Sequence, residues 1–415
     1  MKSALLRHPA LLVALILVAL TGFTVVTQAQ TVSGEISVGN GPSGIDADPA
    51  TDRIYVANQQ SNNVSVIDGK TDSVVATVPV GAGPGEVVVN LNTNRVYVAN
   101  GFSNDVSVID GNSSAVAATV SVGSQPTRLA VDPNTNRIYV TNFRGDSVSV
   151  IDGSNNTVVA TIQVGFRPTA VVVDAPNDRI YVANTNGNSV SVIDGKTNSV
   201  VATIPVGTSP QAMALGPSGN QLYVANNGSN DVSIIDGTSN SVVTAIPVGT
   251  QPLAVVASPM DDRVFVANFN SNSISIIDSS SNSVIGTTTV GTGPTSLGTN
   301  LVTGRIYAVN ESSNSVSVLD GSGAEVVTLP VGSDPTRLAV NPTTNRVYVS
   351  NSQGNSVSVI ADTASGATPS AIHTAATEPD SSSSLPVGLV GIAAVALAAL
   401  GFVAYRLHTT RPDGR

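Results

Sequence analysis

Short runs of alternating apolar and polar residues fill most of this chain, and turn-forming residues separate them. Apolar positions alternate in Arg95–Asn100 and in Val106–Asp110, while Ala115–Val122 is rich in Val, Ala and Thr. A shorter apolar run, Glu86–Asn90, comes before them. Alternation with a period of two is typical of a half-buried β-strand. Asp110-Gly111 suits a hairpin turn, because Gly adopts positive φ without strain. We therefore expect four antiparallel strands in this stretch.

The four-strand pattern recurs along the chain. The Asn that ends the second strand returns after 42 residues six times and after 41 residues once. The copies are Asn58, Asn100, Asn142, Asn184, Asn226, Asn268, Asn310 and Asn351. Eight copies at one repeat position indicate a structural role. Four strands in a repeat of this length are typical of a propeller blade. The sequence therefore predicts an all-β fold, a β-propeller of eight four-stranded blades, with seven blades as the alternative.

The two ends of the repeat region predict how the ring closes. Val32–Gly39 reads as a fourth strand with no first three strands before it, and Val357–Ile360 reads as a third strand with no clear fourth strand after it. Pairing the two would complete the last blade and leave no exposed sheet edge. The 41-residue unit has lost one residue near Gly321–Glu325, in a turn where a deletion is tolerated.

Three motifs recur in register and carry a family resemblance. Ile54–Asn58 reads IYVAN, Val64–Asp68 reads VSVID, and Val74–Gly81 reads VVATVPVG. Over roughly residues 35–362 the chain resembles the YVTN-family β-propeller repeats of archaeal surface-layer proteins and bacterial surface proteins. The resemblance implies an extracellular propeller, often seven-bladed, with an adhesive or envelope role and no shared catalytic residues.

The segments outside the repeats predict export and anchoring. Lys2 and Arg7 precede an apolar run, and Thr27 and Ala29 are the small residues of a signal-peptide cleavage site, with an uncleaved anchor as the alternative. Leu385–Tyr405 carries no charge and is long enough to span a bilayer, and arginines follow it. The predicted domains are a signal peptide (1–29), the propeller (30–362), a Ser/Thr/Ala/Pro-rich stalk (363–384), a transmembrane helix (385–405) and a cytoplasmic tail (406–415). The expected location is the cell membrane, single-pass, with the propeller on the extracellular side.

Composition narrows the chemistry that the ring can perform. The chain has no Cys, which excludes disulfides and thiol catalysis. Its three His residues are His8, His373 and His408, so none lies in the predicted ring. The net charge is −10 and no basic stripe is present, which argues against nucleic-acid binding. We therefore predict no catalytic residues, no metal site and no cofactor.

One group of residues breaks the symmetry of the repeats. On the face shared by the loops between blades and the loops after the second strands, units two to four carry aromatic and Arg residues where other units carry Ser, Asn and Gly. Aromatic side chains beside Arg are typical of recognition surfaces. The predicted ligand-binding residues are Phe102, Arg128, Phe143, Arg144, Phe166 and Arg167.

Together these observations predict a non-enzymatic, membrane-anchored extracellular propeller that acts as a binding, adhesion or envelope module. Its expected partners are a protein or glycan at the cell surface and, through the C-terminal helix, the membrane. The alternative is an extracytoplasmic propeller enzyme of the lactonase or dehydrogenase kind. A sensor is a third possibility, but the tail after Tyr405 is too short for an output domain.

Overall fold

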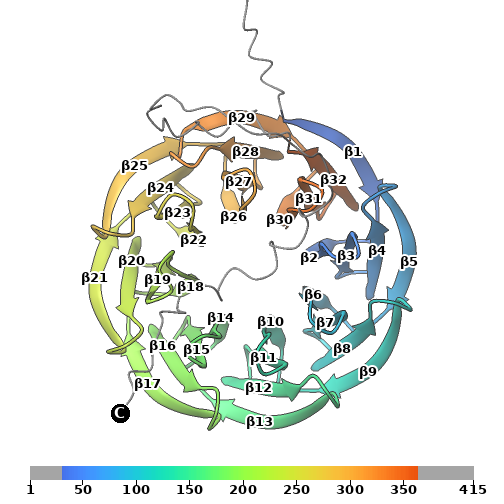
Figure 1. The fold of residues 1–415 in the computed structure, drawn as a ribbon, viewed down its shortest axis with the longest axis horizontal. Coiled ribbons are helices and arrows are strands. Elements are labelled where there is room, and N and C mark those ends of the chain that lie inside the picture. Colours follow the sequence, from blue (N-terminus) through green and yellow to red (C-terminus); the bar gives the residue numbers. More distant parts are fainter. Residues whose placement is uncertain (1–29, 363–415) are drawn as a thin grey trace, which may run out of the picture. The chain divides into compact units, whose positions relative to one another are not determined.

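The computed structural model describes residues 30–362, which form eight four-stranded antiparallel sheets arranged as a closed ring (Figure 1). The prediction of an all-β propeller with eight blades is confirmed. The predicted signal peptide, stalk, transmembrane helix and tail lie outside the described residues. Within residues 30–362, no helix is long and apolar enough to cross a membrane.

The strands of each blade follow one another from the centre of the ring outward. The innermost strands are β2 (Pro42–Asp48), β6 (Pro84–Asn90), β10 (Pro126–Asp132), β14 (Pro168–Asp174), β18 (Pro210–Leu215), β22 (Pro252–Ser258), β26 (Pro294–Asn300) and β30 (Pro335–Asn341). The second strands are β3 (Arg53–Asn58), β7 (Arg95–Asn100), β11 (Arg137–Asn142), β15 (Arg179–Asn184), β19 (Gln221–Asn226), β23 (Arg263–Asn268), β27 (Arg305–Asn310) and β31 (Arg346–Asn351).

The third strands are β4 (Asn63–Asp68), β8 (Asp105–Asp110), β12 (Ser147–Asp152), β16 (Ser189–Asp194), β20 (Asp231–Asp236), β24 (Ser273–Asp278), β28 (Ser315–Leu319) and β32 (Ser356–Ala361). The outermost strands are β5 (Ser73–Pro79), β9 (Ala115–Ser121), β13 (Thr157–Gln163), β17 (Ser199–Pro205), β21 (Ser241–Pro247), β25 (Ser283–Thr289), β29 (Glu325–Pro330) and β1 (Thr31–Ser37). We number the blades 1 to 8 by their innermost strands, from β2 to β30.

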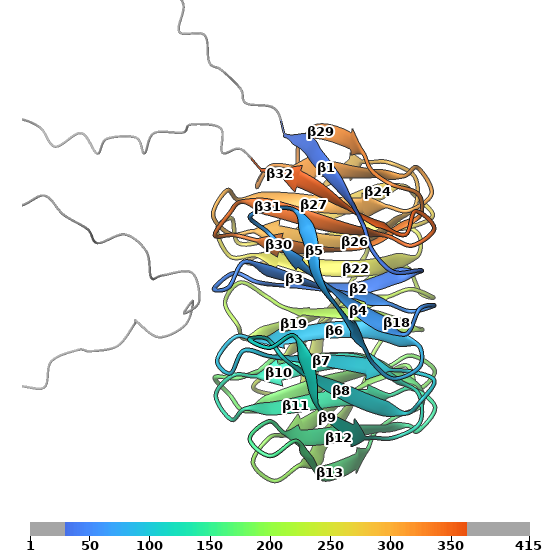
Figure 2. The ribbon, with the colours of Figure 1, turned by 90° about the vertical axis from the view of Figure 1, so that its right-hand side faces the viewer.

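Blade 8 is built from both ends of the described chain. Its strand order is β1-β32-β31-β30, and β1 pairs with β32 from Thr31↔Ala361 to Ser37↔Ser356. Figures 1 and 2 show β1, first in sequence, beside β32, last in sequence. The prediction that the N-terminal strand completes the last blade is confirmed. The deletion in blade 7 also lies where the sequence placed it, in the turn between the shortened strands β28 and β29.

The hydrophobic core is divided among the interfaces between neighbouring blades. Tyr97 of blade 2, for example, packs in one cluster with Leu129 and Ile138 of blade 3. Second-strand residues are almost completely buried on both faces of the sheet, so apolar side chains occur at both alternating positions. The apolar side chains of the second strands therefore determine how neighbouring blades stack.

The repeated Asn has a side-chain partner in every blade. Its Nδ2 donates to the Ser Oγ seven residues later at 2.9–3.1 Å. All eight Asn residues are fully buried. The bond ties the end of the second strand to the third strand, which confirms a structural role for this Asn.

Candidate functional site

The loops between blades and the loops after the second strands meet on one face of the ring. Phe143 N donates to Gln125 O at 2.8 Å, and Thr185 N donates to Arg167 O at 3.0 Å. Each of these bonds joins the loop that enters a blade to the loop that follows its second strand. The backbone therefore holds aromatic residues from different loops on a common surface.

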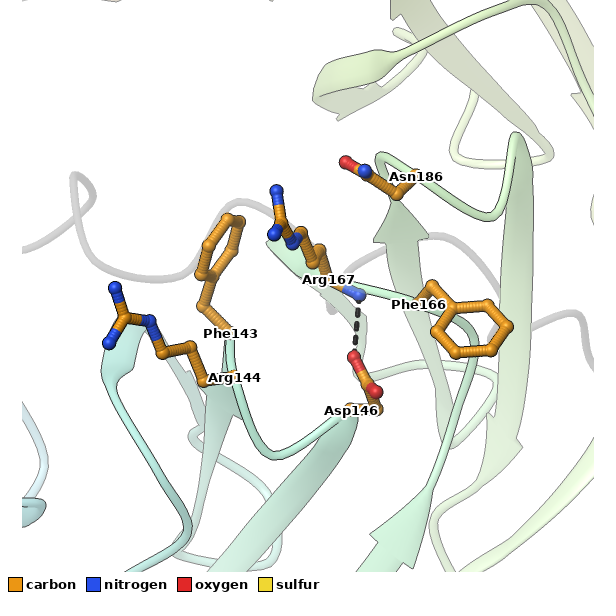
Figure 3. A pocket seen from close by; sticks show the side chains of 6 residues that line it. All are labelled: Phe143, Arg144, Asp146, Phe166, Arg167 and Asn186. Atoms are coloured by element: carbon orange, nitrogen blue, oxygen red, sulfur yellow. Dashed lines mark hydrogen bonds between the residues drawn. The ribbon is translucent and has the colours of Figure 1, made fainter.

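A hollow of about 440 Å³ lies on this face between blades 3 and 4. Its lining residues are Phe143, Arg144, Asp146, Phe166, Arg167 and Asn186 (Figure 3). Four of the six residues predicted from the sequence are among them. The structure thus brings Phe143, Arg144, Phe166 and Arg167 together.

Arg167 is the best-positioned side chain of this hollow. Its guanidinium carbon lies 5.4 Å from the centre of the Phe143 ring, a cation–π distance. Its backbone N donates to Asp146 Oδ1 at 2.8 Å (Figure 3), which engages the one carboxylate of the lining. Phe166 remains 68% exposed. The hollow therefore offers aromatic surface and two Arg side chains to solvent.

The other two predicted residues do not line this hollow. Phe102, 71% exposed, belongs to the neighbouring blade 2. Arg128 is not a loop residue: it is the third residue of β10, and its side chain meets Glu86 in the centre of the ring. Phe269 of blade 6, which the sequence prediction passed over, stands in the same loop position as Phe143, since its N donates to Gln251 O at 2.9 Å.

The centre of the ring carries a second asymmetry, which the sequence prediction missed. At the third position of the innermost strand, blades 4 to 7 have Ala170, Ala212, Ala254 and Ser296, while blades 8, 1, 2 and 3 have Arg337, Gly44, Glu86 and Arg128. One half of the ring therefore has small residues at this position, and three of the four blades of the other half have charged ones. Alignment of this single position across the repeats would have revealed it.

Glu86 joins the two arginines. Its Oε2 lies 2.6 Å from Arg128 Nη1 and 3.8 Å from Arg337 Nε. About a third of each Arg side chain is exposed, 35% for Arg128 and 34% for Arg337, against 18% for Glu86. The three side chains form a partly desolvated cluster, the ring-centre cluster, that solvent reaches through its cationic members.

The electrostatics of the ring-centre cluster favour an added anion. The neighbouring Arg128 charge, together with burial, lowers the pKa of Arg337 to about 10, so the Arg337 guanidinium group stays charged at neutral pH. A single carboxylate, Glu86, lies between them. Two adjacent cations with one shared anion leave an excess of positive charge, which a carboxylate of a ligand would neutralise.

Asp46 adds a titrating group close to this cluster. It lies in β2, and Val89 N of the next blade donates to its Oδ2 at 2.8 Å. Burial raises the pKa of Asp46 to about 7, and the nearby Glu86 charge contributes to the increase. A carboxyl with this pKa is partly protonated at neutral pH and is suited to accept or donate a proton.

Comparison with known families gives one match. A family model described as cytochrome D1 heme domain matches residues 133–370, more than half of the 415 residues. No curated protein matches the chain significantly.

Solved structures share the propeller fold. Hydrazine synthase from Kuenenia stuttgartiensis has a TM-score of 0.58 and 18% identity, covering 83% of this chain and 100% of that one. Dihydro-heme d1 dehydrogenase NirN in complex with DHE has a TM-score of 0.65 and 16% identity, covering 80% and 76%. A functionally unknown protein from Desulfotomaculum acetoxidans has a TM-score of 0.56 and 16% identity, covering 67% and 95%. At these identities the likeness concerns the fold.

The family match corrects two sequence-based predictions. The main functional prediction, a non-enzymatic adhesion or envelope module, and the prediction that the protein is not an enzyme are both wrong. The alternative, a propeller enzyme, agrees better with a heme-domain family. The error has a physical origin. The sequence prediction relied on the absence of His and Cys from the ring and on asymmetry in the loops. The charged residues instead lie in the innermost strands, whose other residues are mostly small or apolar.

Proposed function

Because this chain belongs to the cytochrome D1 heme domain family, we propose that it is a propeller enzyme of the redox class whose ring centre binds a carboxylate-bearing tetrapyrrole. The observation that carries the proposal is the pair Arg128 and Arg337 on either side of Glu86. Heme, when bound, supplies electron-transfer and redox chemistry through its iron and macrocycle.

The ring-centre cluster fits the carboxylate edge of such a molecule. Arg binds carboxylates through paired N–H donors, and these bonds are stronger where solvent is partly excluded. Ala170, Ala212, Ala254 and Ser296 occupy the equivalent strand position in the other half of the ring and are all half-buried. Small side chains there leave apolar surface for the body of a ligand whose charged edge lies at the arginines.

The described residues do not fit the iron of a heme equally well. Heme iron is usually held by His, Cys, Met or Tyr. Residues 30–362 contain no His or Cys, and within them no group of three or more His, Cys, Asp or Glu side chains is placed to hold a metal ion. The roles that we assign to the ring therefore concern binding, orientation and proton transfer.

Each charged residue of the centre has a distinct proposed role. Arg128 and Arg337 bind the ligand carboxylates. Glu86 orients both guanidinium groups before the ligand arrives, which lowers the entropy lost on binding. Asp46 exchanges a proton with the ligand or with water beside it, since its pKa of about 7 allows both protonation states at neutral pH.

Absorbance titration with iron protoporphyrin IX tests the proposal. We expect saturable binding by the full chain in detergent and a loss of at least about tenfold in affinity for the double variant Arg128→Ala/Arg337→Ala, since each charged hydrogen bond contributes about 1.5–3 kcal/mol. Arg95→Ala is the control, because Arg95 pairs with Asp110 in the turn region, 3.5 Å apart, away from the inner strands. Equal affinity for the double variant and the control contradicts the proposal.

The hollow between blades 3 and 4 supports a second proposed site, for a protein or glycan partner of the enzyme. Its support is that Phe143, Phe166 and Arg167 all line one open concavity. Aromatic and Arg side chains dominate the binding energy of many interfaces. The hollow is separate from the ring centre, so a partner could bind there while the centre is occupied.

The location of the ring and its relation to the YVTN repeats are proposed from the sequence alone. We propose that the propeller lies outside the cell and that Leu385–Tyr405 anchors it, because of the uncharged run and the arginines after it. The recurring IYVAN, VSVID and VVATVPVG motifs support descent from YVTN-type repeats. Protease added to intact cells should digest the ring and spare a C-terminal tag; a tag digested from outside contradicts this topology.

A further inference from the structure

The residue types of the ring point to the way in which a tetrapyrrole would be held. Among residues 30–362, no imidazole or thiolate is present, so the two commonest heme-iron ligands are missing there. Met and Tyr remain as candidates, together with the carboxylates of the centre. Iron can contribute to binding only if one of these side chains is placed to coordinate it.

The two methionines of the ring are poorly placed for the centre. Met213 lies in β18, is 8% exposed, and packs in the core cluster that contains Tyr181 and Leu222. Met260 follows β22 in the turn before β23 and is 60% exposed at the rim. One is committed to the core between blades and the other lies beyond the end of its inner strand.

The tyrosines are unsuited for a different reason. All seven in the ring lie in second strands and are at most 1% exposed: Tyr55, Tyr97, Tyr139, Tyr181, Tyr223, Tyr307 and Tyr348. A Tyr ligand binds iron as phenolate, and burial raises the pKa of Tyr55, Tyr223 and Tyr348 to about 12. Burial therefore both blocks access to these hydroxyls and disfavours their ionisation.

The carboxylates of the centre already have partners. Glu86 Oε2 is shared by Arg128 and Arg337. Asp46 accepts backbone N–H groups on both oxygens, from Ala47 at 2.9 Å and from Val89 at 2.8 Å. A metal would have to displace these bonds, whereas an anionic ligand would add to the two guanidinium groups without breaking them.

We infer that the ring holds a tetrapyrrole by its carboxylates alone, between Arg128 and Arg337, so that metal-free and iron-containing macrocycles bind with similar affinity. The inference rests on the proposed function and makes it more specific. The macrocycle is then held as an exchangeable ligand, a substrate or cargo of the ring, and not as a cofactor fixed through its iron.

Three probes separate the contributions of iron and carboxylate. They are metal-free protoporphyrin IX, iron protoporphyrin IX, and the dimethyl ester of the metal-free compound, each titrated into the full chain in detergent. The chain contains no Trp whose fluorescence could report binding. The absorbance of the macrocycle is therefore the readout. We expect dissociation constants within about threefold for the two acids and at least about tenfold weaker binding of the ester, as expected for the loss of charged hydrogen bonds. Arg128→Ala/Arg337→Ala should weaken both acids by the same factor.

The outcomes distinguish the inference from the proposed function. If the iron compound binds more than tenfold tighter than the metal-free one, iron ligation holds the macrocycle and the inference is wrong, while the proposed function stands. His373→Ala then shows whether the ligand comes from the segment that follows the ring. If neither acid binds, both the proposed function and the inference are wrong. Equal binding of acid and ester also overturns the inference, because the carboxylates then contribute nothing.

Discussion

Glu86 of blade 2 lies 3.8 Å from Arg337 of blade 8, although blade 1 stands between them. Blade 1 has Gly44 at the equivalent position, so it contributes no side chain there. A Cβ on Gly44 would lie 2.8 Å from Glu86 Cα and 2.8 Å from Gly85 O, so a side chain there would meet the backbone of blade 2. Gly44 therefore allows blades 1 and 2 to approach closely beside the ring-centre cluster, and closure of the ring between blades 8 and 1 brings Arg337 to Glu86.

Replacing Gly44 tests this dependence. Gly44→Ala should destabilise the fold by about 1–3 kcal/mol, as expected for overpacking against backbone, and should weaken binding of protoporphyrin IX. Urea unfolding and absorbance titration measure the two effects. Gly85→Ala is the matched control, since a Cβ there has no atom within 4 Å, and its stability should change by less than about 0.5 kcal/mol. Equal stabilities of the two variants would show that blades 1 and 2 have room to adjust.

The pKa of Asp46 predicts a pH dependence of stability. Its value of about 7 in the folded chain lies above the usual 3.8. Between about pH 4 and pH 7 the folded state therefore holds more protons than the unfolded state, and stability falls as pH rises, by at most about 1.4 kcal/mol per pH unit from this group. The contribution is complete below about pH 4 and is lost above pH 7.

Asp46→Asn removes this contribution. The free energy of unfolding, measured by urea at several pH values, should show a shallower decrease between pH 5 and pH 7 in the variant. Asp52 and Glu311 also have raised pKa values through burial, but their effect is common to both proteins and cancels in the comparison. Parallel pH profiles would mean that Asp46 titrates normally.

Much of the fold followed from the sequence because it depends on repetition. The period of Asn58 and its copies predicted the blades, and the unpaired run at Val32–Gly39 predicted the closure. The ring-centre cluster did not follow, because Glu86, Arg128 and Arg337 are far apart in sequence and each looks like an isolated variation of its own repeat. Only the closed ring places the three together, and only the geometry of β10 shows that Arg128 belongs to the centre.

Removing the closing strand tests the ring as a whole. Deletion of residues 30–39 leaves β32 with an unpaired edge, and we expect the melting temperature to fall by roughly 5 °C or more, a loss of several kcal/mol. A synthetic peptide of residues 30–39 should restore part of the loss, and a peptide of scrambled sequence should not. An unchanged melting temperature after the deletion would contradict a closing role for β1.

The hollow between blades 3 and 4 should affect partner binding and leave stability nearly unchanged. Protein and glycan arrays probed with the ring should show partners that are lost with Phe143→Ser/Phe166→Ser, because exposed aromatic anchors contribute on the order of 2 kcal/mol to interfaces. Phe269→Ser is the control, with the same residue type and loop position in blade 6. Identical array profiles for the two variants would place partner recognition elsewhere.

The composite blade 8 can fold only after the whole ring has been synthesised. In blades 1 to 7 every strand pairs with strands made within the same repeat, so each sheet can form as soon as its own segment has been made. β1 is synthesised first, but its pairing partner β32 is synthesised last, since Thr31 pairs with Ala361. A chain that stops anywhere before β32 leaves β1 unpaired, and an unpaired strand is prone to aggregation and open to proteolysis. Completion of the ring thus reports that translation has reached residue 361, and incomplete products remain distinguishable to the cell's quality control.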